Sequence, residues 1–373
     1  MKPIARAAAT LAAAAVSILT TAGVASANAG PSAAGEVYVQ TNDPGGNVVR
    51  VYDRLHDGSL RAAGSYDTGG LGGALTGAVV DRLASQGSVL LDAPAHLLYV
   101  VNAGSDSLTV FGVQGSRLHR LQVVPTGGDF PVSVSAHDHR LAVLNARDGG
   151  SVQGFARVGA RVVPVAGWHR DLGLDPAATP EFTHTPGQVA FTPDGRALLV
   201  TTKAGSNAVD VFRWGATGLA DAPVVTSLPG AVPFAVAFDP RGHAVVAEAS
   251  NAVATFAVEA SGALRPLDAQ PTGQAATCWI AADGRHVFLS NAGSATVSTY
   301  RVAASGALRA GAVTATHPGT VDAAVSGDGR YLYVETGAQG VVDAFRVGSH
   351  GVLTPVGSTT VPGAAGGEGI AAS

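Results

Sequence analysis

The sequence predicts an all-β protein, a seven-bladed β-propeller whose blades are four-stranded antiparallel sheets. Three observations predict this fold: a recurring aromatic residue, a repeated set of four short β-like runs, and complementary chain ends. The aromatic residue ends an apolar segment seven times, at Tyr52, Phe111, Phe155, Phe212, Phe256, Tyr300 and Phe345. Four of the six spacings are 44 or 45 residues and the others are 59 and 57, so the repeat is about 44 residues with two insertions.

Each repeat contains four runs with the alternation and β-branched residues of strands, separated by Gly, Asp, Asn and Ser. In the sixth repeat the runs are TCWIA (277–281), HVFLSN (286–291), ATVSTYRV (295–302) and LRAGAV (308–313). The 3.6-residue apolar stripe of helical repeats is missing. Four strands in 40–45 residues are typical of a propeller blade.

The two ends of the chain are expected to close the ring. GEVYVQT (35–41) matches the second strand of a repeat, whereas GGEGIAAS (366–373) resembles a first strand such as GTVDAAVS (319–326). We therefore expect the C-terminal strand to become the innermost strand of blade one. This closure removes two sheet edges that would otherwise be exposed.

The N-terminus has the features of a secretory signal peptide. Lys2 and Arg6 give a positive start, residues 7–24 are apolar and small, and ASA (25–27) is a small-x-small cleavage site. ANA (27–29) is a second choice of cleavage site. A transmembrane anchor is the less favoured alternative, because the segment is Ala-rich and only weakly hydrophobic.

The predicted organisation follows from the leader and the repeats. Residues 1–27 are a signal peptide, 28–34 a short flexible N-terminus, and 35–373 a single propeller domain with insertions near 67–88 and 167–185. The protein is therefore expected to be secreted and extracellular.

Composition narrows the class of partner. The net charge is −4 and the pI is near 6.2, so no basic surface for nucleic acid is evident. No second long apolar run suggests membrane association after signal cleavage. Cys278 is the one cysteine, so stability must come from the core rather than from an intrachain disulfide. We expect a monomer that needs no metal or cofactor.

Strand order separates two faces of the ring. The DGR sequences at 194–196, 283–285 and 328–330 fall between first and second strands and are interpreted as hairpin turns. Both insertions connect an outer strand to the next inner strand, and therefore lie on the opposite face. Long connections on a rigid scaffold commonly carry function, so we expect the site on that face.

The candidate site residues lie at the expected mouth of the central channel on that face. Ester opening needs a base for water and a positive or donor group for the oxyanion. His184 or Glu248 is the candidate base, and Lys203 or Arg147 the candidate oxyanion partner. Cys278 is interpreted as a buried small hydrophobe rather than as a nucleophile. The candidate substrate-binding residues are Arg147, Gln188, Trp279, Asp322, Glu335 and Glu368.

Three stretches carry a family resemblance: GQVAFTPDGRALLVTTKAGSNAVDVF (187–212), PFAVAFDPRGHAVVAEA (233–249) and TCWIAADGRHVFLSNAGSATVSTYRV (277–302). They resemble the secreted bacterial branch of the lactonase family of seven-bladed propellers, which includes 6-phosphogluconolactonase-like and carboxymuconate-cyclase-like proteins. The resemblance implies metal-independent lactone chemistry. Catalytic members often carry a His-x-His element where this chain has Thr185, Pro186 and Gly187.

Two functional hypotheses remain open on the sequence. The first is a lactonase-like carboxylic ester hydrolase that opens a lactone or sugar-like ligand at the channel mouth. The second is a noncatalytic extracellular propeller that binds a small ligand or a protein on the same face.

Overall fold

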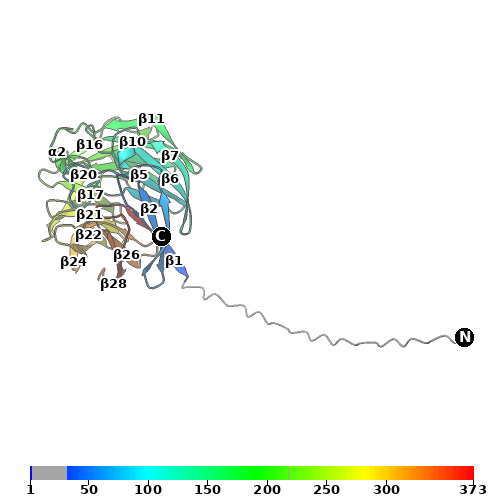
Figure 1. The fold of residues 1–373 in the computed structure, drawn as a ribbon. Helices are drawn as coiled ribbons and strands as arrows, with labels where there is room; N and C mark the ends of the chain where they lie inside the picture. Colours follow the sequence, from blue (N-terminus) through cyan, green and yellow to red (C-terminus); the bar gives the residue numbers. More distant parts are fainter. Residues whose placement is uncertain (2–31, 217) are drawn as a thin grey trace. The chain divides into compact units, whose positions relative to one another are not determined.

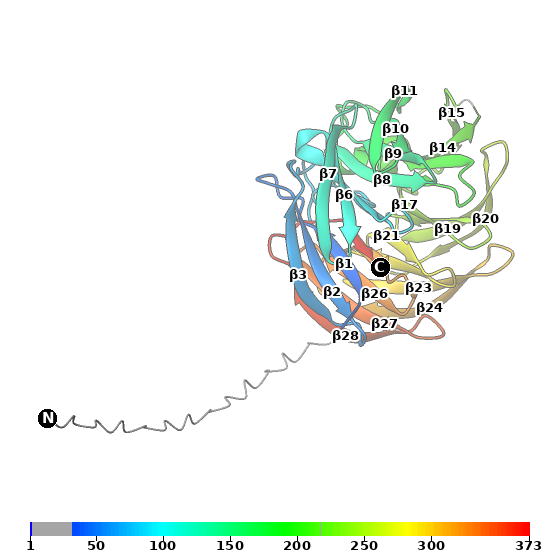
Figure 2. The same cartoon turned by 90° about the vertical axis from the view of Figure 1, so that its right-hand side faces the viewer.

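Residues Ala33–Ser373 fold into a ring of seven antiparallel β-sheets, which is the predicted fold class (Figures 1 and 2). The computed structural model describes residues 1, 32–216 and 218–373, so the expected signal segment, apart from Met1, lies outside the described residues. None of the helices in the described part of the chain is long and apolar enough to cross a membrane.

The blades follow one another along the chain, and within each blade the strands run from the centre outward. Blade one contains β29 (Ile370–Ala372), β1 (Ala33–Gln40), β2 (Val48–Leu55) and β3 (Leu60–Asp67). Blade two contains β4 (Val89–Asp92), β5 (Leu97–Asn102), β6 (Ser107–Gln114) and β7 (Arg117–Pro125). Blade three contains β8 (Pro131–His137), β9 (Arg140–Asn145), β10 (Ser151–Val158) and β11 (Arg161–Asp171).

Blade four differs in its outer edge, which is divided into two short strands. It contains β12 (Gln188–Phe191), β13 (Ala197–Thr201), β14 (Ala208–Gly215), β15 (Gly218–Leu219) and β16 (Val224–Ser227). Blade five contains β17 (Pro233–Phe238), β18 (Ala244–Glu248), β19 (Ala252–Val258) and β20 (Leu264–Pro271). Blade six contains β21 (Thr277–Ala282), β22 (Val287–Asn291), β23 (Thr296–Val302) and β24 (Leu308–Ala315). Blade seven contains β25 (Thr320–Val325), β26 (Tyr331–Thr336), β27 (Val341–Val347) and β28 (Leu353–Thr360).

The ring is held by apolar packing between neighbouring sheets. The inner strands contact one another in succession, β29 to β4, β8, β12, β17, β21, β25 and back to β29. The recurring aromatic residues are all buried; Phe155 and Phe212 have no exposed surface. Full burial of such a side chain contributes roughly 1.5–3 kcal/mol, so the repeat that marks the blades also supplies their core.

The C-terminal strand closes the ring as predicted. In blade one β29 pairs antiparallel with β1, where Tyr38 lies opposite Ala371 and Val39 opposite Ile370. The Oγ of Ser373 donates a hydrogen bond to the Glu36 carboxylate at 2.7 Å. The last residues of the chain therefore complete the first blade.

Residues 68–88, which connect β3 to β4, cross the centre of the ring without forming a strand or a helix. We call residues 75–88 the plug. Gln86 exchanges two hydrogen bonds with the backbone of Ile280 in blade six, and the Ser85 hydroxyl donates to the Val132 carbonyl in blade three. The amide of Arg82 donates to Gly366, just before β29. Because these partners stand on different sides of the ring, the plug covers the mouth of the channel.

The second long connection, residues 172–187, contains the one-turn helix α1 (Glu181–His184). Two further short helical turns, η1 (Ala103–Ser105) and α2 (Lys203–Ser206), lie in connections between second and third strands. In every blade, the antiparallel order places these connections on the same face as the plug. We call this the connection face.

Candidate functional site

A polar pocket of about 140 Å³ opens on the connection face beside α1. Its walls come from the turn between β9 and β10 and from the second long connection. It is lined by Ala146, Arg147, Asp148, Gly149, Leu174, Asp175, Pro176, Ala178, Glu181, His184 and Thr185. Two residues singled out from the sequence, Arg147 and His184, therefore line the same pocket.

Arg147 is held in the polar pocket by a carboxylate and an aromatic ring. Its Nε donates to Glu181 Oε1 at 2.7 Å, and its guanidinium lies 4.3 Å from the centre of the Phe130 ring. Burial alone would raise the pKa of Glu181, but hydrogen bonds from Arg147 and Thr76 outweigh it and hold the pKa at about 2. Glu181 is therefore ionised at neutral pH and fixes the direction of the arginine.

His184 ends α1, and its ring is oriented by the preceding turn of chain. Its Nδ1 lies 2.9 Å from the carbonyl oxygen of Pro180 and 2.9 Å from the hydroxyl of Thr183. Because a carbonyl can only accept, the contact assigns the proton of the neutral ring to Nδ1. Nε2 is then the basic nitrogen, the state that a general base requires.

Lys203 lies under α1 and joins the plug to the second long connection. Its Nζ donates to the carbonyls of Ala84 and Phe182 at 2.7 and 2.6 Å and to the Thr185 hydroxyl at 3.0 Å. The side chain is buried, and burial lowers its pKa to about 7, against the opposing effect of Asp81. The three acceptors match the three N–H donors of the ammonium. All three donors are therefore already used within the protein.

A second, apolar pocket of about 390 Å³ lies on the other side of α1, between the plug and blades five and six. Its lining residues are Val79, Val80, Asp81, Ala84, Phe182, Phe234, Ala276, Cys278, Trp279, Ala292 and Gly293. The Trp279 ring packs 4.8 Å from the Phe234 ring, centre to centre, and its Nε1 donates to the Ser85 carbonyl at 2.6 Å. Trp279 therefore lines a pocket separate from the one that Arg147 and His184 line.

Asp81 is an ionisable residue of the apolar pocket that sequence reasoning missed. Its carboxylate accepts from the amides of Leu83 and Ser85 at 2.7 and 3.0 Å, and burial raises its pKa to about 6. Burial also raises the pKa of the Cys278 thiol to about 12. The neutral thiol agrees with the interpretation of Cys278 as a small hydrophobe. The sequence signal that could have identified Asp81 was its position in the first insertion, on the face where the site was expected.

Glu248 lines neither pocket. It is the last residue of β18 and pairs with Ala252, and burial raises its pKa to about 7. At the same strand position blade six has Asn291, which donates to the hydroxyls of Thr296 and Ser298. In blade five the corresponding residues are Ala252 and Ala254, whose side chains offer Glu248 no hydrogen-bond partner. The structure thus brings His184 together with Arg147, and places Lys203 and Glu248 elsewhere.

The remaining candidates lie deeper in the ring. Gln188 accepts a hydrogen bond from the Val236 amide at 2.6 Å, and so joins blade four to blade five. Asp322, Glu335 and Glu368 are buried, and burial raises the pKa of each, to about 7 for Asp322. Repulsion adds to the raised pKa of Glu335, from Asp322 and Asp81, and to that of Glu368, from Asp81 first and then Asp322 and Glu335. None of the four lines either pocket.

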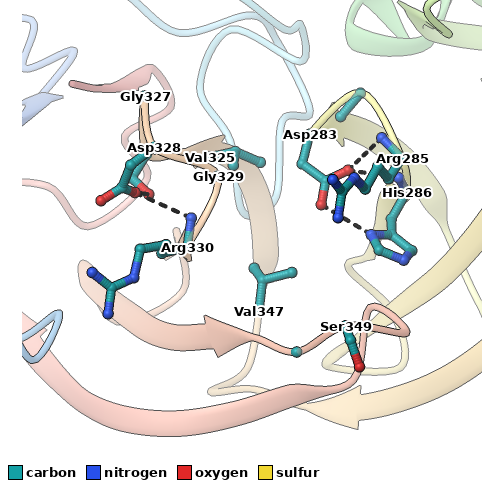
Figure 3. A pocket seen from close by; sticks show the side chains of 13 residues that line it. Asp283, Arg285, His286, Val325, Gly327, Asp328, Gly329, Arg330, Val347 and Ser349 are labelled. Atoms are coloured by element: carbon teal, nitrogen blue, oxygen red, sulfur yellow. Dashed lines mark hydrogen bonds and ion pairs between the residues drawn. The ribbon is translucent and has the colours of Figure 1, made fainter.

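A larger cavity, about 590 Å³, lies on the opposite face between blades six and seven (Figure 3). Asp283, in one of the DGR turns, accepts from the amides of Arg285 and His286 at 2.7 and 2.6 Å and from His286 Nδ1 at 2.9 Å. Asp328 in the next blade accepts from the Arg330 amide at 3.1 Å. The carboxylates therefore stabilise their own turns, as the hairpin interpretation predicts.

The fold is a seven-bladed propeller, and Arg147 and His184 line a polar pocket on its connection face. The sequence model of the family "Lactonase, 7-bladed beta-propeller" matches residues 173–366, and the chain belongs to this family. No curated protein gives a significant match to the chain.

Solved structures share the fold at low sequence identity. The periplasmic gluconolactonase PpgL of Pseudomonas aeruginosa is 22% identical, with a TM-score of 0.70 over 90% of this chain and 98% of that one. A Lactobacillus plantarum protein is 19% identical, with a TM-score of 0.70 over 90% and 98% of the two chains. A candidate 6-phosphogluconolactonase of Bacteroides fragilis is 18% identical, with a TM-score of 0.69 over 91% and 97%.

Proposed function

We propose that this protein hydrolyses a small lactone in the polar pocket, with His184 as general base and Arg147 as oxyanion partner. The observation that carries the proposal is that these two side chains line one pocket, Arg147 from the β9–β10 turn and His184 from the connection between blades three and four. Family membership supports lactone chemistry. The pocket offers a basic nitrogen and a fixed positive charge, the two groups that ester opening requires.

The proposed reaction needs only water and the lactone. His184 Nε2 takes a proton from water as the water oxygen bonds to the lactone carbonyl carbon. The resulting oxyanion is stabilised by the Arg147 guanidinium. Collapse of this intermediate breaks the ring C–O bond, and the imidazolium returns its proton to the departing ring oxygen. The product is the open-chain hydroxy acid, and the base is regenerated. In this scheme Glu248 and Lys203 take no part in the reaction steps, because neither lines the pocket. Lys203 stabilises the wall of the pocket by donating a hydrogen bond to Thr185.

Export is a second part of the proposal. The leader-like segment at residues 1–27 supports it, as does the structural similarity to a periplasmic gluconolactonase of Pseudomonas aeruginosa. Expression of the full chain in a bacterial host, followed by N-terminal sequencing of the protein from the culture medium, tests it. A mature N-terminus near residue 28 is expected. Retention of residues 1–27 would contradict export by this leader.

Lactone hydrolysis is tested with the purified protein against a panel of sugar lactones and simple alkyl lactones, by following acid release. The wild type should exceed the buffer rate, and His184→Ala and Arg147→Ala should each lower kcat/KM by about 100-fold or more. His350→Ala and Arg265→Ala are matched controls, because both residues are exposed and lie outside the pocket. No excess over buffer for any lactone, or full activity of both pocket variants, would refute the proposal.

A noncatalytic binding function is the alternative, and one observation favours it. Beside the polar pocket lies a larger pocket whose lining is mainly apolar and whose thiol is neutral. Such a pocket can hold a ligand without reacting with it.

A further inference from the structure

The apolar pocket has the size and shape of a small-molecule site. At about 390 Å³ it falls in the range of about 300–1,000 Å³ that is typical of ligand pockets. Segments distant in sequence form its walls: the plug, α1 through Phe182, blade five through Phe234 and blade six through Trp279. Aromatic rings thus contribute to the lining from different segments, which suits a flat or branched hydrophobic ligand.

The polar groups around this pocket are already engaged by the chain. The indole N–H of Trp279 donates to Ser85, and the two oxygens of Asp81 accept backbone amides. The nearby ammonium of Lys203 has three acceptors. A ligand in this pocket therefore meets mainly hydrocarbon and aromatic surface, and strongly polar ligand groups would lose their hydration without replacement.

Charge excludes one broad class of ligand. Asp81 is the charged residue among those that line the pocket, and the pKa of about 6 leaves it mostly ionised at pH 7.5. The thiol of Cys278 is neutral. A phosphate or carboxylate placed here would face a negative charge without a free cation, so the pocket disfavours anions.

The rim of the pocket carries an exposed apolar side chain. Val79 has 83% of its surface exposed, although it borders a cavity that also contains buried Trp279 and Cys278. Because Val79 lines the pocket at the protein surface, a molecule bound there would cover it.

We propose that the apolar pocket is a second ligand site, separate from the polar pocket, that takes an uncharged hydrophobic small molecule. The occupant is a compact ring or branched hydrocarbon with few polar groups. The lining of the pocket, its charge and its aromatic walls select this class. The site acts independently of lactone hydrolysis, because α1 separates the two pockets.

A pair of fluorescent probes tests the proposal on the purified protein. N-phenyl-1-naphthylamine is uncharged, and 1-anilinonaphthalene-8-sulfonate has the same aromatic skeleton with a sulfonate. The uncharged probe should bind saturably with one site per chain, and the sulfonate should bind at least 10-fold more weakly at pH 7.5. Equal binding of both probes, or no saturable binding of the uncharged probe, would overturn the proposal.

Matched variants place the binding in the pocket. Val79→Asp puts a charge on the rim and should weaken binding of the uncharged probe at least 10-fold, as should Ala292→Trp, which fills the pocket. Val158→Asp is the control, because Val158 is also exposed but lies on β10 in blade three. His184→Ala should leave probe binding unchanged, and Val79→Asp should leave lactone hydrolysis unchanged.

Two results would count against the inference. One is unchanged probe binding in both pocket variants, with thermal melting curves like the wild type. The other is a wild-type dimer, seen by sedimentation velocity, that Val79→Asp converts to a monomer. In that case a second copy of the chain covers the pocket.

Discussion

Phe182 and His184 lie on the same one-turn helix, α1, yet line different pockets: Phe182 the apolar pocket and His184 the polar pocket. A single short turn therefore forms the partition between two cavities of opposite character. The partition is anchored on both sides. The carbonyl of Phe182 accepts from Lys203 Nζ at 2.6 Å, and Glu181 accepts from the Thr76 amide at 2.6 Å.

The ion pair of Arg147 and Glu181 should position the proposed oxyanion partner. Glu181→Gln keeps the size of the side chain but removes its charge, so Arg147 loses the interaction that fixes its direction. We expect kcat for lactone hydrolysis to fall about 10- to 100-fold, with a smaller change in KM. Steady-state kinetics measure the effect. Glu259→Gln is the control, since it removes the partner of the exposed Arg265. A variant with wild-type kcat would show that Glu181 does not position Arg147.

Lys203 should contribute strongly to stability, because its ammonium satisfies three buried acceptors. Lys203→Met keeps an unbranched side chain that is one atom shorter and removes every hydrogen bond of Nζ. We expect a loss of about 3 kcal/mol in the free energy of unfolding, measured by urea denaturation. Arg241→Met, at an exposed turn on the opposite face, should change stability by less than about 0.5 kcal/mol. Equal stability of wild type and Lys203→Met would show that these contacts add nothing.

Closure of the ring by β29 should be essential for thermal stability. Deletion of residues 364–373 removes the inner strand of blade one and exposes the edge of β1, so a large fall in the melting temperature, or failure to fold, is expected. Ile370→Ala is the milder test, because the side chain is buried and its truncation costs about 2–4 kcal/mol. Differential scanning calorimetry measures both variants. Melting like the wild type in both would contradict closure by this strand.

Stability should fall as the pH rises from about 4 to 7. Burial raises the pKa of Asp322 from 3.8 to about 7, so in this window the folded state keeps a proton that the unfolded state releases. Burial raises the pKa of Glu335 and Glu368 in the same direction. Lys203 has a lowered pKa and acts oppositely, but only above about pH 7. Urea denaturation at pH 5 and pH 7 should therefore show greater stability at pH 5.

Asp322→Asn identifies the residue responsible for part of this pH dependence. The variant should flatten the stability profile between pH 4 and 7, since each pKa unit corresponds to about 1.4 kcal/mol. The exposed Asp43→Asn variant should keep the wild-type profile. The slope of the profile, rather than its absolute height, is the readout. An unchanged slope in Asp322→Asn would contradict the assignment.

The fold could be predicted because its signal is repeated. Each blade carries a phenylalanine or tyrosine at the same position of its third strand, and each of these residues is buried in the core, as Phe111 and Phe212 are. The closing strand was also accessible from sequence, because residues 366–373 retain the pattern of an inner strand. Periodicity therefore determined the number of blades and the faces on which connections lie.

The site was only partly accessible from sequence. The predicted strand order placed Arg147 and His184 on the connection face, and this was enough to name them as candidates. Both residues line one pocket. It could not show that Lys203 would be bound by acceptors from the plug and from α1, since the path of residues 68–88 follows from tertiary contacts and has no periodic pattern. Asp81 was missed for the same reason, because its place in the apolar pocket depends on that path.

The pairing of β29 with β1 has a consequence for the order of biogenesis. Glu36 and Ser373 are hydrogen-bonded although they are 337 positions apart in the chain. A ribosome must release the final residues before the first blade can be completed, so the inner edge of β1 stays unpaired throughout synthesis. Contacts of such long sequence separation form late and slowly. The nascent chain therefore cannot complete its ring before translation ends.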